Sequence, residues 1–224
     1  MKEQQREQQQ QRLEEHIREE HKEELANSLT HGFGLLLCVV AIPVLMFCTA
    51  SKGGAMNILS SAVFSFSLLM VYASSTIYHS ISIPGIKSKL RILDHICIYF
   101  LIAGSYTPFI VIALNKGFEL LIIMWIMVAL GTLFKLLVQI DKAEFISVVS
   151  YVIMGWAGVI YVQDLWVDLP LLSFSFLVAG GACYSIGVIF YLWDNLIYNH
   201  AIWHLFVIGG SSFHFASLMV KLNF

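Results

Sequence analysis

The stretch SLTHGFGLLLCVVAIPVLMFCT, residues 28–49, is an apolar run that contains no Asp, Glu, Lys or Arg. A helix needs about 20 predominantly apolar residues to cross the hydrocarbon core of a bilayer. A strand of a membrane barrel needs only about 9–11 residues of alternating polarity, and this run shows no such alternation. The run therefore predicts a membrane-spanning α-helix.

Six further apolar runs of similar length follow, separated by short polar connections. We expect spans at 56–79, 92–114, 118–140, 145–163, 170–193 and 199–221. The whole chain is 58% hydrophobic and only 12% charged, whereas soluble domains carry roughly 25% charged residues. This composition excludes an ordinary soluble enzyme, a disordered chain and a disulfide scaffold. It predicts an all-α integral membrane protein, a seven-transmembrane helix bundle that occupies residues 25–224.

The first 24 residues differ sharply from the rest, because they are rich in Gln, Glu, Lys and Arg and contain few apolar side chains. Such a segment is a solvated helix or a disordered arm. A plain cytoplasmic lead-in and a partner-binding helix are both compatible with it. The formal net charge of −2 shows no basic footprint for nucleic acid, so that class of partner is excluded.

The distribution of Lys and Arg predicts the orientation, because these residues collect in the short cytoplasmic connections of membrane proteins. With the N-terminus inside, ten Lys and Arg fall on the cytoplasmic side and three on the other. Seven spans also require the two termini to lie on opposite sides. We therefore expect a cytoplasmic N-terminus and an external C-terminus.

Ionisable side chains at the ends of these apolar spans are functional candidates, because charge is costly inside a membrane. His79 ends the second span, Asp94 opens the third, and His200 and His204 open the seventh. The predicted topology puts all four at the cytoplasmic boundary. His200 and His204 lie one helical turn apart and share a face, and Ser75 lies one turn deeper than His79.

Three neutral imidazoles and a water molecule form a typical catalytic zinc shell. A zinc ion in such a shell activates the water and polarises a carbonyl group. Asp94 would then orient that water or take its proton. Each residue also has a structural interpretation: a histidine at a helix end can be an anchor, Asp94 can interact with the helix dipole, and Ser75 can hydrogen-bond to its own helix.

An ordered set of short motifs resembles the hemolysin III family, which belongs with the progestin and adipoQ receptors and more loosely with the alkaline ceramidases. The motifs are ELANSLTH at 24–31, SSTIYH at 74–79, LDH at 93–95, AGSYTP at 103–108 and HAIWH at 200–204. The resemblance implies seven helices with the N-terminus inside and a zinc site near the cytoplasmic face. It implies His79, His200 and His204 as the metal ligands, with Ser75 and Asp94 as supporting catalytic groups.

Three other histidines lie within or beside the spans. His31 starts the first span, where it lines the entrance to the site or anchors the helix end. His95 points about 100° away from its neighbour Asp94 around the helix, so we exclude it from the metal ligands. His214 lies roughly 15 Å deeper than His204 at 1.5 Å per residue, too far for the same ion; a buried polar contact or part of an internal cavity would explain it.

Three functions are compatible with these features. The first is a zinc-dependent hydrolase of a lipid amide or ester that takes its substrate from the membrane, contributing to membrane-lipid homeostasis. The second is a non-catalytic sensor or receptor-like regulator of membrane state with a structural zinc ion. The third, a pore-forming haemolysin, fits least well, because seven apolar spans without a secretory signal do not resemble a secreted toxin. The family resemblance places the protein in a bacterial plasma membrane, with membrane lipids as its partners.

Overall fold

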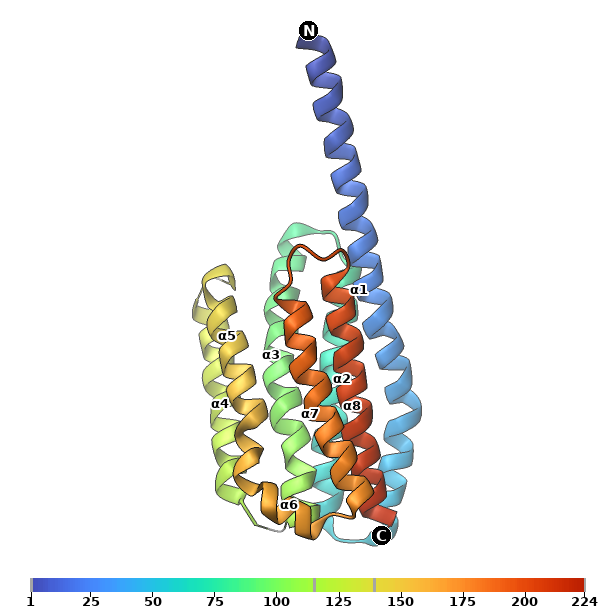
Figure 1. The fold of residues 1–224 in the computed structure, drawn as a ribbon, viewed down its shortest axis with the longest axis vertical. Coiled ribbons are helices and arrows are strands. Elements are labelled where there is room, and N and C mark those ends of the chain that lie inside the picture. Colours follow the sequence, from blue (N-terminus) through green and yellow to red (C-terminus); the bar gives the residue numbers. More distant parts are fainter. Residues whose placement is uncertain (1, 115, 139, 224) are drawn as a thin grey trace.

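The computed structural model describes residues 2–114, 116–138 and 140–223, which are helical throughout apart from short connections (Figure 1). The α-helices are α1 (Lys2–Lys52), α2 (Ala55–Ser80), α3 (Pro84–Pro108), α4 (Phe118–Leu137), α5 (Ile140–Trp156), α6 (Val162–Asp168), α7 (Leu171–Tyr191) and α8 (Asn199–Asn223). Within these described residues, seven spans are long and apolar enough to cross a membrane. The prediction of an all-α, seven-helix membrane protein is confirmed.

The charged arm is the first part of α1, which runs without a break from the arm into the first span. Gln, Glu, Lys and Arg are good helix formers, so the arm stays helical although its side chains are exposed. It projects beyond the bundle in Figure 1. The helix ends before Gly53 and Gly54, whose φ angles of 77° and 90° suit residues without a Cβ.

Two of the seven spans contain more than one type of helix. The third continues beyond Pro108 as a π-helix, Phe109–Leu114. Proline lacks the amide hydrogen that donates to the α-helical hydrogen bond. Pro108 therefore accounts for the change from α-helix to π-helix at this point. The fifth span consists of α5, a 3₁₀ segment at Ala157–Tyr161, and α6; the sequence predicts one helix there.

The helices pack so that the ends of α2 and α7 and the starts of α3 and α8 lie at one end of the bundle (Figure 1). Helix α1 packs against α2 and α8, α2 against α3, and α7 against α8. The arm leaves the bundle at the same end, and the C-terminus lies at the opposite end. This arrangement brings parts of α1, α2, α3 and α8 that are distant in sequence to one depth.

Candidate metal centre

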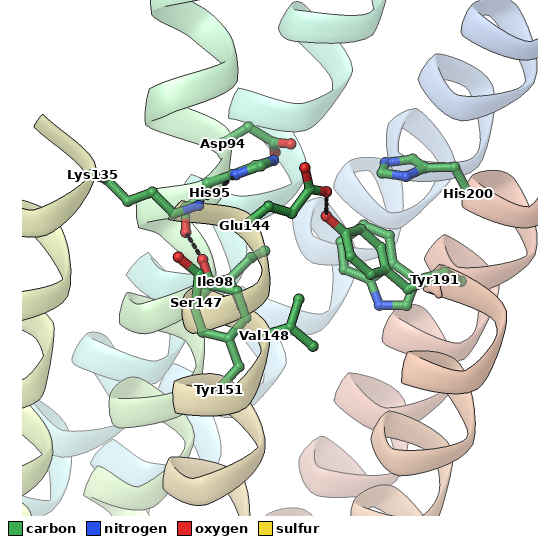
Figure 2. Close-up of a pocket in the computed structure, with 11 residues that line it drawn as sticks. Asp94, His95, Ile98, Lys135, Glu144, Ser147, Val148, Tyr151, Tyr191 and His200 are labelled. Atoms are coloured by element: carbon green, nitrogen blue, oxygen red, sulfur yellow. Dashed lines mark hydrogen bonds between the residues drawn. The ribbon is translucent and has the colours of Figure 1, made fainter. Parts of the chain in front are cut away.

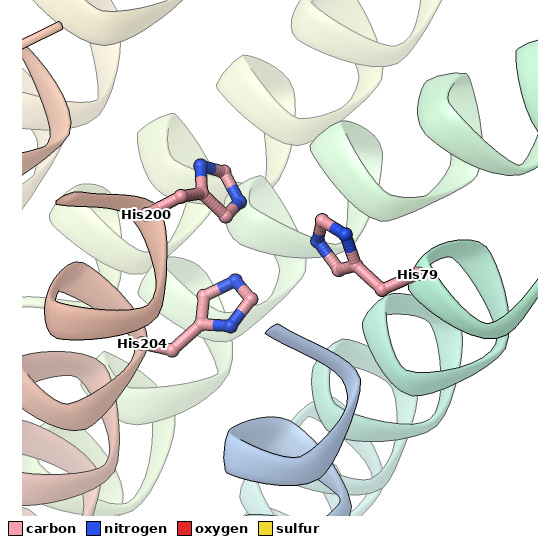
Figure 3. Close-up of side chains that lie close together, drawn as sticks. All are labelled: His79, His200 and His204. Carbon is pink, nitrogen blue, oxygen red and sulfur yellow. The ribbon is translucent and has the colours of Figure 1, made fainter. Parts of the chain in front are cut away.

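Three histidines from two helices meet at this end of the bundle (Figure 3). One ring nitrogen of each of His79, His200 and His204 lies within 4.8 Å of the others. His79 and His204 are buried, and His200 is partly buried. Because α8 begins at Asn199, His200 and His204 occupy its first two turns and face α2 together.

The hydrogen bonding of these three rings leaves a nitrogen of each available to bind a metal ion. The Nε2 atom of each is buried, and no group in the described part of the chain forms a hydrogen bond with it. A buried polar atom left unpaired costs roughly 1–3 kcal/mol. Imidazole nitrogen is a preferred ligand of zinc. One ring nitrogen from each of three histidines around one point therefore fits a zinc ion.

The carboxylate of Glu24 contacts the other ring nitrogen of His79. His79 Nδ1 lies 3.0 Å from Glu24 Oε2 and donates to it, and Lys87 Nζ donates to the same oxygen at 2.7 Å. A proton on Nδ1 leaves Nε2 free to bind a metal. This carboxylate–histidine pairing is common behind metal-binding histidines and fixes the orientation of the ring.

Helix α1 also holds the ring of His204. Its Nδ1 lies 3.2 Å from the carbonyl oxygen of Asn27 and 3.1 Å from the hydroxyl of Thr30. The His31 ring stacks on the His204 ring, with centroids 3.5 Å apart and planes inclined by 18°. His31 is only 1% exposed, so it belongs to the buried cluster rather than to a surface anchor.

Asp94 and Ser75 lie beside this cluster rather than among the three converging rings. Asp94 is buried on α3, with the hydroxyls of Ser74 and Ser75 next to its carboxylate. Asp94 and His200 line one cavity (Figure 2) of about 10 Å³. That volume accommodates about one water molecule. The structure thus brings a carboxylate and a histidine to a water-sized space.

The far wall of the cavity is a polar cluster on α3, α4 and α5. Lys135 is 1% exposed, and its Nζ lies 2.9 Å from His95 Nδ1. Glu144 joins α5 to α3 through Arg91 at 3.3 Å and to α7 through a short hydrogen bond from Tyr191. His95 therefore faces α4 and lies outside the histidine cluster, as its position on the helix indicates.

His214 lies elsewhere, deeper in the bundle. Its ring contacts those of Phe109 and Tyr184 edge-on, with centroids 6.0 and 5.3 Å away. A Cβ at Gly180 would lie 2.2 Å from the ring, so the glycine makes room for it. His214 is packed between helices and is not part of the metal centre.

Sequence reasoning missed the contribution of α1. Glu24 falls within the charged arm, where a carboxylate is expected to be solvated, and Asn27 and Thr30 are ordinary residues at a helix entrance. The missed signal was their spacing: Glu24, Asn27 and His31 recur at intervals of three and four residues, and so share one helical face. That face is the one that packs against α2 and α8.

Comparisons with known proteins cover nearly the whole chain. The family described as Haemolysin-III related matches residues 19–215. The chain is 43% identical over 206 residues to the Hemolysin-3 homolog of Bacillus subtilis (strain 168), an alignment that covers 90% of this chain and 96% of the relative. It is 42% identical over 196 residues to Hemolysin-3 of Bacillus cereus, covering 86% and 88%. It is also 28% identical over 205 residues to the human Monocyte to macrophage differentiation factor, covering 86% and 82%. The matched region includes every residue of the candidate metal centre.

Proposed function

The chain belongs to the Haemolysin-III related family of multi-pass membrane proteins, and on that premise we propose that it is a zinc-dependent hydrolase of a lipid amide or ester. The metal ligands are His79, His200 and His204. The observation that carries this proposal is the convergence of one ring nitrogen from each of these three histidines, whose Nε2 atoms are buried without hydrogen-bond partners among the described residues. His200 also lines a water-sized cavity together with the Asp94 carboxylate.

Zinc held by three imidazoles supplies Lewis-acid activation of a water molecule and of a carbonyl group. The side chains of the protein have separate tasks. Glu24, Asn27 and Thr30 hold the rings of His79 and His204 so that their Nε2 atoms face inward. These contacts reduce the freedom of the rings before the metal binds.

Asp94 is the proton acceptor in this proposal, because its buried carboxylate lines the cavity together with His200. Ser75 is the hydrogen-bond donor to the substrate carbonyl oxygen as negative charge develops there. Its hydroxyl is buried and accepts or donates no hydrogen bond of standard geometry within the described residues. The burial of both groups strengthens their electrostatic effect on the reacting atoms.

The proposed location is the cell membrane, with the N-terminal arm and the metal centre on the cytoplasmic side. Ten of the thirteen Lys and Arg residues lie on that side in this orientation. The substrate is a membrane lipid that reaches the centre from within the bilayer, and the reaction contributes to lipid homeostasis.

A non-catalytic regulator with structural zinc is the second candidate, favoured by a different observation. The cluster joins three helices, because His79 on α2 bonds to Glu24 on α1, and His204 on α8 bonds to Asn27 on α1. A metal at its centre would fix the relative positions of α1, α2 and α8. Such a site would respond to membrane state without turnover.

The metal content of detergent-purified protein tests the shared part of both candidates. We expect one zinc per chain in the wild type and none in the His200→Ala/His204→Ala double variant. The matched control is His16→Ala/His21→Ala, which removes two exposed histidines of the arm and should keep the zinc. Full occupancy in the first double variant, or no zinc in zinc-supplied wild type, would refute the site.

Hydrolysis of long-chain N-acyl amides and acyl esters in mixed micelles then separates the two candidates. The hydrolase predicts release of fatty acid by wild-type protein and no release by Asp94→Asn, which retains its zinc. If the zinc-loaded wild type cleaves none of these substrates, the hydrolase is refuted and the non-catalytic regulator is retained.

A further inference from the structure

Lys135 is a charged side chain inside a membrane-spanning helix, and no step of the reaction described above uses it. It lies near the end of α4 and is 1% exposed. Its Nζ atom makes one hydrogen bond within the described residues, to His95 Nδ1 on α3 at 2.9 Å. Charge is costly inside a membrane span, so a buried lysine there is a candidate functional group by default.

Lys135 faces the water-sized cavity that Asp94 and Glu144 also line (Figure 2). The cavity has a volume of about 10 Å³, enough for about one water molecule. An ammonium group has three N–H donors, and the hydrogen bond to His95 leaves two of them for that water. A water whose oxygen accepts from Lys135 can donate its two hydrogens to the carboxylates of Asp94 and Glu144.

The two carboxylates differ in their access to solvent. Asp94 is 4% exposed, whereas the Glu144 side chain is 38% exposed. Glu144 lies in the first turns of α5, at the end of the bundle from which the arm projects (Figure 1). Arg91 donates to its Oε2 at 3.3 Å, and the Tyr191 hydroxyl donates to its Oε1. Glu144 therefore connects the closed cavity with the solvent at this end.

The surroundings of the cavity favour the passage of a proton over the binding of an ion. The charged and titratable groups on or beside its walls are Arg91, Asp94 and His95 on α3, Lys135 on α4, Glu144 and Tyr151 on α5, Tyr191 on α7 and His200 on α8. The formal charges of Arg91 and Lys135 balance those of Asp94 and Glu144. The ammonium group also repels a metal cation, and the volume leaves no space for a hydrated anion.

We propose that Glu144 removes the proton that Asp94 takes up, through one cavity water held by Lys135. The O–H bond of protonated Asp94 breaks while a new O–H bond forms on the water, and the water gives a different hydrogen to Glu144. Glu144 then releases the proton to the solvent. Asp94 becomes ionised again, the water is regenerated and no electrons are exchanged. Lys135 and His95 are positioning residues, because they hold the water and take no proton.

The use of this route during turnover rests on the proposed hydrolase, whereas the existence of the route does not. Hydrolysis of an ester, RCOOR′ and H₂O, yields RCOO⁻, R′OH and one H⁺. Hydrolysis of an amide, RCONHR′ and H₂O, yields RCOO⁻ and R′NH₃⁺ at neutral pH, so the amine product retains that proton. A route for proton release therefore matters more for an ester than for an amide.

The first test compares Glu144→Gln with the wild type on an ester and an amide that carry the same acyl chain. Ester turnover should fall about 100-fold, the lower end of what a positioned proton-transfer group contributes, and amide turnover should fall less. Concentrated imidazole buffer should restore ester turnover, because a soluble base can reach the exposed position of residue 144. A structural defect would reduce both substrates alike and would not respond to buffer.

Lys135→Met removes the donor to the water and should show the same selective loss of ester turnover; it replaces Glu144→Gln if that variant does not fold. The matched control is Ser150→Ala, which removes another contact between α3 and α5, the 2.7 Å hydrogen bond to the Tyr99 hydroxyl. Ser150 does not line the cavity, so its ratio of ester to amide turnover should equal that of the wild type. Equal losses for both substrates in both cavity variants would overturn the proposal.

The second test needs no turnover. Protein labelled with ¹⁵N at lysine Nζ is studied by NMR, and the signal of the buried Lys135 is identified by its absence in Lys135→Met. Exchange of its Nζ hydrogens with water should be about tenfold slower in Glu144→Gln, because the base beside the cavity water is lost. Exchange in Ser150→Ala should match the wild type.

The two tests allow the proposed hydrolase and the proton route to fail separately. If the zinc-loaded wild type hydrolyses neither substrate, slower exchange in Glu144→Gln supports the route without the hydrolase. Equal exchange rates in Glu144→Gln and the wild type refute the route. Hydrolysis with an unchanged ratio of ester to amide turnover in both cavity variants refutes the route and retains the hydrolase.

Discussion

Replacement of Glu24 by Ala is the sharpest test of how the helices build the metal centre. Glu24 Oε2 accepts hydrogen bonds from His79 Nδ1 at 3.0 Å and from Lys87 Nζ at 2.7 Å. Loss of such an outer carboxylate typically weakens metal binding about 10- to 100-fold. The Glu24 side chain is 25% exposed, so water screens part of its charge and we expect the lower part of this range.

The expected result for Glu24→Ala is a zinc dissociation constant about tenfold higher, which corresponds to about 1.4 kcal/mol. Glu24→Gln should lie between Ala and the wild type, because its carbonyl oxygen still accepts from Nδ1 while the charge is lost. The assay is competition for zinc between the detergent-solubilised protein and a chromophoric chelator. Thermal unfolding of each apo-protein checks that the fold is retained.

Glu19→Ala is the control, because Glu19 is an exposed carboxylate of the same arm that pairs with Lys22 at 2.8 Å, outside the site. Its zinc affinity should match that of the wild type. Equal affinity of Glu24→Ala and wild type would refute the reasoning that α1 orients His79. An equal loss in Glu19→Ala would show that the effect comes from the charge of the arm rather than from this contact.

Three further predictions follow from the same structure. Asp94→Asn should keep one zinc per chain and lose any lipid hydrolysis, measured by metal content and fatty-acid release; loss of zinc would make Asp94 a ligand instead. Gly131→Ala should lower stability by about 1–3 kcal/mol, because the new Cβ would lie 2.4 Å from the Tyr99 ring; an unchanged melting temperature in detergent would show that α3 and α4 separate freely. Protease added outside sealed, right-side-out vesicles should leave the arm intact and cleave it in inverted vesicles, and the opposite pattern would reverse the proposed orientation.

The level of the site along the membrane could be predicted from the sequence. Hydropathy defines where each span begins and ends, and alternate spans run in opposite directions. His79 at the end of the second span and His200 and His204 at the start of the seventh must then lie at the same end of the bundle. The structure brings these three rings together, with Asp94 nearby.

The partners of the rings could not be predicted in the same way. Each depends on how α1 is rotated about its axis and how closely it approaches α2 and α8, and these are set by packing rather than by hydropathy. Glu24 illustrates the difference: its sequence neighbours are charged and solvated, whereas its contact, His79, lies 55 residues away. Lys135 is a similar case, since it counts as a cytoplasmic charge in the sequence but is buried against His95 in the fold.

The sequence by itself determined that this protein crosses the membrane seven times as helices, and which ionisable residues share one depth. It could do so because the bilayer imposes a length and a polarity on every span, and both are local properties of the chain. Only the tertiary structure decided which faces meet: that α1 supplies Glu24, Asn27 and His31 to the histidines, and that α3, α4 and α5 bring Asp94, Lys135 and Glu144 to one cavity. The physical reason is that helices in a membrane associate through side-chain packing and hydrogen bonds between distant residues, and a single stretch of sequence does not contain those contacts.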